Sequence, residues 1–130
     1  MEKCTFCKIV KGEIPADKVY EDNEFLSFLT IGPVSFGHIL LIPKEHLVWM
    51  QEAPDEMLAK IFQLSKKLMQ AMKTGIGCDY VLVSVAGKDV PHFHIHLIPR
   101  HFNDNLPDFP AQKYKDEEKV EVVKKITGAF

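Results

Sequence analysis

Three histidines alternate with apolar residues in one short segment, PHFHIHLIPR, at residues 91–100. A β-strand rises about 3.3 Å per residue and alternates its faces. A strand here would therefore carry His92, His94 and His96 on one face, with neighbours roughly 6–7 Å apart. The apolar residues between them would point into the core.

Two kinds of chemistry suit this triad. The imidazoles could chelate a metal, because an H-x-H pair on a strand offers two nitrogens to zinc. Alternatively, one neutral imidazole could attack phosphorus while its neighbours fix its tautomer, hold the leaving group and supply its proton. The spacing is compatible with both. A half-solvated strand that happens to use histidine is disfavoured, because the histidine recurs three times.

A second candidate site is the C-x-x-C pair of Cys4 and Cys7. In a reducing compartment this spacing indicates half of a metal site or a redox pair, not a disulfide framework. Cys78 stands alone beside a predicted strand and is interpreted as a small buried residue.

The composition predicts a single globular domain over residues 1–130, with 46% apolar and 26% charged residues. The net charge of -2 and the lack of a basic block give no basis for binding nucleic acid polymers. The segment MEKCTFCKIVKGEIP lacks the apolar core of a signal peptide, and no apolar run approaches the roughly 20 residues that span a bilayer. We therefore expect a cytoplasmic protein with no membrane partner.

The predicted elements follow from apolar periodicity. Two short strands within residues 19–29 meet at a turn, residues 38–43 form a buried strand, and residues 79–86 form a central strand. A long amphipathic helix is expected over residues 54–73, with Pro54 in its first turn and Gly75 just past its end. A short helix over residues 116–127 follows the histidine segment. This order predicts an α+β fold with a largely antiparallel sheet.

The chain resembles the histidine-triad superfamily from about Cys4 to Arg100. HFHIHLI matches the H-x-H-x-H signature with apolar spacers, and CTFCKIVKGEIPADKVYEDNEFLSFL with PVSFGHILLIPKEH is similar to the family's N-terminal half. The resemblance implies a five-stranded antiparallel sheet, a homodimer, and a hydrolase or transferase that acts on nucleotides. Such an enzyme would release a nucleoside monophosphate from a phosphoramidate or a dinucleoside polyphosphate, through a nucleotidyl-histidine intermediate.

The resemblance also assigns roles. His94 would be the nucleophile, His96 would contact the scissile phosphate and leaving group, and His38 would support the nucleophilic imidazole. The residues expected around the nucleobase are Phe6, Ile9, Phe28 and Ile31.

The sequence departs from the family pattern at two binding positions. Thr30 stands where many members carry an acidic residue for the ribose hydroxyls, and Thr cannot accept from both hydroxyls as a carboxylate does. Lys88 follows Gly87 where the family has a glutamine that meets phosphate. The lysine could contribute charge to phosphate or could be a solvated turn residue.

The resemblance further implies a structural zinc site formed by Cys4, Cys7, His46 and His92, and no organic cofactor. A Cys₂His₂ set is a closed tetrahedron, so it would tie residues 1–15 to the histidine segment and leave no position for a catalytic water. The alternative is a pair of unliganded thiols with His46 on the surface.

Two other functions remain open on the sequence. The triad could hold a divalent ion that activates water, or the chain could bind nucleotides without turnover. Beyond the triad, Arg100 could help to hold phosphate or a partner subunit, and His101 is expected on the surface.

Overall fold

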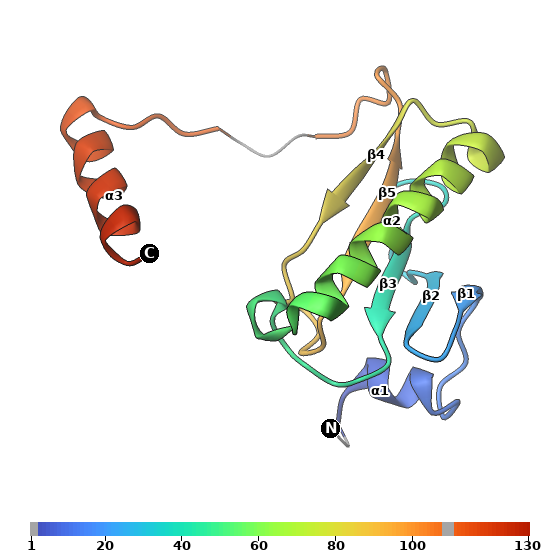
Figure 1. The fold of residues 1–130 in the computed structure, drawn as a ribbon. Coiled ribbons are helices and arrows are strands. Elements are labelled where there is room, and N and C mark those ends of the chain that lie inside the picture. The colour runs from blue at the N-terminus through green and yellow to red at the C-terminus, as the bar shows by residue number, and fades with distance from the viewer. Residues whose placement is uncertain (1–2, 108–110) are drawn as a thin grey trace.

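The strands form one five-stranded sheet in the order β1-β2-β3-β5-β4, and every neighbouring pair is antiparallel. The computed structural model describes residues 3–107 and 111–130. The elements are α1 (Thr5–Val10), β1 (Lys18–Glu21), β2 (Phe25–Leu29), β3 (Ile39–Pro43), a 3-10 turn (Met50–Glu52), α2 (Asp55–Ile76), β4 (Tyr80–Ser84), β5 (Ile95–Arg100) and α3 (Asp116–Gly128) (Figure 1). This arrangement confirms the predicted α+β fold.

The two faces of the sheet pack against different helices. On one face, α2 contributes Ile61, Leu64 and Leu68 to a core that includes Ile95 and Leu97 of β5. On the other face, α1 covers a second apolar cluster that includes residues of β2 and β3. Because side chains alternate along a strand, a buried strand such as β3 supplies both cores.

The long helix ends later than predicted. Gly75 lies inside α2, and Gly77 ends the helix with a φ of 80°. Its N–H donates to the carbonyl of Lys73, as glycine does at a left-handed helix end. Gly75 was therefore the wrong glycine, because both fit the spacing and only the backbone conformation separates them.

Strand β4 is an edge strand, so its prediction as a central strand was wrong. Its apolar run resembles a strand buried on both faces, but its side chains are only partly buried and Val83 is exposed. An apolar run does not reveal whether a neighbouring strand follows, because that depends on the whole topology.

The two terminal helices differ in how they are held. Helix α1 was not predicted, and its six residues bury Phe6, Cys7 and Ile9. Helix α3 has nearly the predicted bounds but buries none of its side chains and lies apart from the sheet (Figure 1).

The histidine segment is only partly a strand. Strand β5 begins at Ile95, so His92 and His94 precede it. Their N-terminal neighbours form a turn in which the N–H of His92 donates to the carbonyl of Val90. The alternation of side chains nevertheless persists, because Phe93 points into the α2 core as predicted. The histidine side is not half-solvated, since His92 and His94 are 0% and 1% exposed.

Candidate active site and metal centre

The backbone fixes the tautomer of His94. Its Nδ1 lies 2.7 Å from the carbonyl oxygen of His92, and because a carbonyl can only accept, Nδ1 carries the proton. Nε2 of a neutral His94 therefore keeps its lone pair. Among residues 3–107 and 111–130, Nε2 of His94 is the only buried side-chain nitrogen or oxygen without a hydrogen-bond partner.

A second pair of histidines forms a chain of hydrogen bonds with a fixed direction. The N–H of Val34 donates to Nδ1 of His38 over 3.0 Å, so the proton of neutral His38 is on Nε2. That Nε2 lies 3.0 Å from Nδ1 of His96, to which it donates. Nε2 of His96 is then left as an N–H donor. One backbone amide thus determines what His96 offers to a ligand.

Burial keeps this pair neutral. Burial, and then the charge of His96, lowers the pKa of His38 to about 4. The pKa of His96 is also lowered, again by burial and then by the charge of His94. The hydrogen-bond chain therefore needs no added proton at neutral pH.

An apolar pocket of about 520 Å³ lies beside His96. His96 and Asp89 line it together with Thr30, which was predicted at the ribose position, and with all four predicted base-binding residues, which are Phe6, Ile9, Phe28 and Ile31. The Phe6 ring meets the Phe28 ring edge-on at 5.5 Å between centroids and the His94 ring at 5.1 Å. A flat apolar ligand could lie here with its polar end at the histidines.

The charged residues of the pocket differ from the predicted ones. Lys88 is exposed and is not among the residues that line the pocket, whereas Asp17 and Asp89 line it and were missed. Asp89 Oδ1 lies 3.4 Å from His94 Nε2. Partial burial raises the pKa of Asp89, but its own backbone N–H and the charges of His94 and His96 outweigh this, so its pKa is lowered overall. Its position just before the triad was the one available signal.

The second cluster brings together the four predicted metal ligands. The donor atoms of Cys4, Cys7, His46 and His92 all lie within 4.8 Å of one another. Cys7 Sγ is 3.1 Å from His46 Nδ1, and His92 Nδ1 is 3.4 and 3.5 Å from the two sulfurs. Donors around a tetrahedral zinc ion are separated by roughly 3.3–3.8 Å, given its bond lengths. The four residues therefore fit zinc.

The surroundings of this cluster also suit a cation. His92 Nε2 lies 2.8 Å from the carbonyl of Pro43, to which it donates, so Nδ1 faces the sulfurs with its lone pair. Burial, followed by the neighbouring Cys4, raises the pKa of Cys7 to about 11. A thiolate in this place needs a positive charge beside it.

Asp89, His94 and His96 form another group with closely spaced donor atoms. It suits a metal less well, because Nε2 of His96 carries a proton whenever Val34 and His38 make their hydrogen bonds. Of its two imidazoles, only His94 presents a free lone pair.

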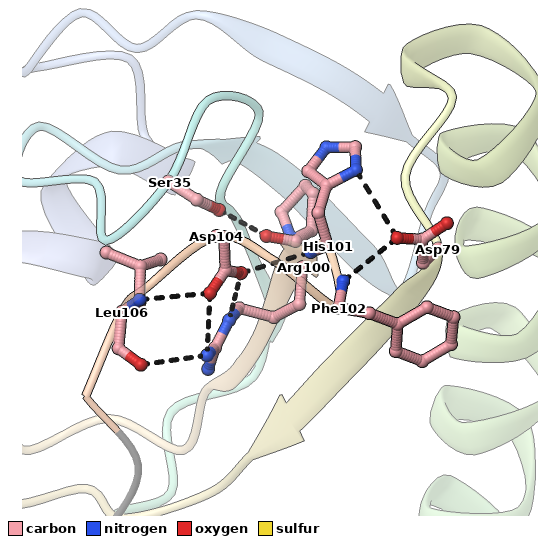
Figure 2. A network of polar contacts seen from close by, with 8 residues as sticks. Ser35, Asp79, Arg100, His101, Phe102, Asp104 and Leu106 are labelled. Carbon is pink, nitrogen blue, oxygen red and sulfur yellow. Dashed lines mark hydrogen bonds and ion pairs between the residues drawn. The ribbon is translucent and has the colours of Figure 1, made fainter.

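Arg100 is not among the residues that line the pocket, and its side chain belongs to a network of polar contacts (Figure 2). Its guanidinium makes two hydrogen bonds to Asp104, at 2.6 and 3.1 Å, and one to the carbonyl of Leu106. The hydrogen bond from Arg100 holds the pKa of Asp104 well below its usual range. Arg100 therefore fixes the turn after β5, and His101 beside it is exposed as predicted.

Comparison with known proteins identifies the family. The HIT domain matches residues 11–103. The chain belongs to the HIT family. An uncharacterised HIT-like protein of Methanocaldococcus jannaschii is 42% identical over 96% of this chain and 99% of its own length. An adenosine 5′-monophosphoramidase of Schizosaccharomyces pombe is 45% identical over 75% of this chain and 74% of its own.

The HIT fold is also found in similar solved structures. A protein of Streptococcus mutans UA159 has a TM-score of 0.88 and 33% identity, with 99% of this chain and 86% of that chain covered. A zinc-bound histidine triad protein of Mycobacterium smegmatis has a TM-score of 0.77 and 30% identity, with 99% of each chain covered. Family members thus include a nucleotide hydrolase and a zinc-bound protein.

Proposed function

We propose that the chain is a nucleotide hydrolase or nucleotidyl transferase that acts through a covalent intermediate on His94. One observation carries this proposal: Nε2 of His94 is buried, keeps its lone pair and has no hydrogen-bond partner among the described residues, and the neighbouring His96 and Asp89 line an apolar pocket. A buried polar atom without a partner costs free energy and therefore calls for an explanation. A nucleophile that meets its partner only when substrate binds provides one.

The reaction has two displacements at one phosphorus atom. His94 Nε2 attacks phosphorus, and the bond to the leaving group breaks with its electron pair on that group. Water then attacks the phosphorus and releases a proton to solvent, while the P–Nε2 bond breaks and its electron pair returns to His94. In each step the His96 N–H can donate to the leaving atom or the phosphoryl oxygens, while Phe6, Phe28 and Ile31 enclose the base.

Structural zinc is the second part of the proposal. It is supported by the donor spacing at Cys4, Cys7, His46 and His92 and by the zinc-bound relative. Bound zinc would stabilise the cysteine thiolates and hold α1 against the turn that precedes His94. All four ligand positions belong to the protein, so this zinc has no role in activating water.

We also infer a homodimer formed by the single domain of residues 1–130. Its support is the open edge of β4, whose backbone groups can pair with another strand. No helix of the described residues is long and apolar enough to cross a membrane. The cysteines Cys4, Cys7 and Cys78 are all free, which supports a cytoplasmic location.

Release of AMP from adenosine 5′-phosphoramidate and from diadenosine polyphosphates tests the proposal. Wild type should form AMP and should gain the mass of one nucleotidyl group when quenched during turnover. His94→Ala should show neither. If wild type binds nucleotide but forms no AMP from any substrate, the chain is a non-catalytic binding protein, and Thr30 and Lys88 mark the change.

A further inference from the structure

Asp89 is a charged group beside the reacting atoms. One carboxylate oxygen lies within 4.8 Å of a ring nitrogen of His94 and of His96. The side chain is 69% exposed and lines the pocket. Asp17 lines the same pocket but does not belong to this cluster. Asp89 is therefore the pocket carboxylate that lies beside the proposed nucleophile.

A carboxylate in this place works against the bound substrate. The phosphoryl group is anionic, and like charges at such distances repel each other inside a partly dry site. His38 and His96 are neutral, and Lys88 does not line the pocket, so none of these three offsets the charge of Asp89. The substrate itself can offset it if the leaving group becomes positive.

We propose that Asp89 selects the leaving group by its charge and favours an amine bonded to phosphorus over an anionic leaving group. This inference rests on the proposed function, since it concerns the first displacement at His94. What it adds is a residue that decides between the substrate classes of that function, with the amine of a phosphoramidate facing Asp89.

The first displacement explains the preference. When His94 Nε2 bonds to phosphorus, the electron pair of the P–N bond stays on the leaving nitrogen. That nitrogen takes a proton from solvent before the bond breaks and becomes positively charged. It then departs with the electron pair as a neutral amine. Asp89 stabilises the positive charge that develops on the nitrogen.

Asp89 has the opposite effect on an anionic leaving group. A sulfate or a second nucleotide takes the electron pair on oxygen and departs with added negative charge. Asp89 then raises the energy of the transition state instead of lowering it. The same carboxylate therefore acts in opposite directions on the two substrate classes.

The test is a ratio of two specificity constants. Wild type, Asp89→Asn and Asp89→Glu are assayed with adenosine 5′-phosphoramidate and with adenosine 5′-phosphosulfate, which share the nucleotide and differ in the leaving group. We expect wild type to favour the phosphoramidate. Asp89→Asn should lower the ratio of kcat/KM values by about tenfold or more, the effect of one nearby charge. Asp89→Glu should restore most of it.

Two controls separate charge from structure. Asp17→Asn removes the other carboxylate of the pocket and should leave the ratio within about twofold, whatever it does to nucleotide affinity. Rising salt should lower the ratio in wild type and not in Asp89→Asn, because salt screens an exposed charge. Thermal unfolding of each variant confirms that it is folded.

The outcomes are distinct. A ratio that is unchanged in an active Asp89→Asn, or a wild type that favours the phosphosulfate, overturns the selection by Asp89 and leaves the nucleophile in place. Failure of wild type to form AMP or a nucleotidyl adduct from either substrate overturns the proposed function and this inference with it.

Discussion

Two buried histidines that are two residues apart, His92 and His94, commit opposite nitrogens to the backbone. His92 donates from Nε2 to the carbonyl of Pro43 and turns Nδ1 toward the sulfurs of the metal cluster. His94 donates from Nδ1 to the carbonyl of His92 and leaves Nε2 free. The ring chemistry is the same in both, and the acceptor carbonyl decides which nitrogen remains reactive.

The two clusters also differ in how they can be satisfied. At the metal cluster, four donor atoms lie close together, and one bound cation would give each of them a partner. At the reactive cluster, Nε2 of His94 has no hydrogen-bond partner in the described part of the chain, and His96, which lines the pocket, presents an N–H from Nε2. The metal cluster therefore serves stability, and the reactive cluster serves catalysis. Substitutions in the first should mainly change stability, and substitutions in the second should mainly change activity.

The largest effect should come from the nucleophile. His94→Asn should lower kcat/KM for adenosine 5′-phosphoramidate by at least about 1,000-fold, because no other group can form the covalent intermediate. The metal content and the unfolding midpoint should stay close to those of wild type. Loss of metal together with activity would instead support a divalent ion held by the triad. His101→Asn, an exposed histidine, is the matched control.

The metal cluster should show the reverse pattern. Cys7→Ser should lose bound zinc, measured by elemental analysis, and should lower the free energy of unfolding by about 3 kcal/mol or more. Activity of the folded fraction should fall less than in His94→Asn, since zinc only positions the histidine turn. Cys78→Ser controls for the loss of a buried thiol elsewhere. A Cys7→Ser protein of unchanged stability and zinc content would contradict this assignment.

The pH dependence of stability should report on His38. Its pKa is about 4 when folded and about 6.5 when unfolded, so the unfolded chain binds a proton first as the pH falls. Wild type should therefore lose about 2–3 kcal/mol of stability between pH 6.5 and pH 4 from this residue alone. Urea unfolding of wild type and His38→Leu at several pH values isolates the contribution of His38 to the pH dependence of stability, because the metal contribution is common to both. Parallel curves would contradict a buried neutral His38.

His38 should also affect catalysis without touching the substrate. His38→Leu removes the donor to His96 and leaves the tautomer of that ring unfixed, so kcat should fall by about tenfold. Zinc content should not change. Titration of the His96 ring nitrogens by NMR would show whether the proton moves from Nε2 to Nδ1. An unchanged His96 tautomer in this variant would show that Val34 and His38 do not control it.

The sequence was sufficient for most of the fold but not for the direction of each imidazole. Alternation and helical spacing predicted the strands and α2, because burial follows periodicity. The set of metal ligands was implied by the family resemblance. The tautomers depend on carbonyls distant in the chain, such as Pro43 for His92, and no local pattern contains them. Asp89 was missed for the same reason, since only the folded turn brings its carboxylate next to Nε2. The end of α2 at Gly77 could not be predicted either, because Gly75 and Gly77 differ there only in backbone conformation.

The smallest effect should come from Thr30 and should separate recognition of the ribose from recognition of the base. Thr30 lines the pocket near Ile31, where the family resemblance expects a carboxylate. Thr30→Asp would supply an acceptor for both ribose hydroxyls and should lower KM for ribonucleotides by about threefold to tenfold, with kcat unchanged. The 2′-deoxy substrates should gain less, because one hydroxyl is missing. An equal gain for both sugars would mean that residue 30 acts on the pocket shape and not on the ribose.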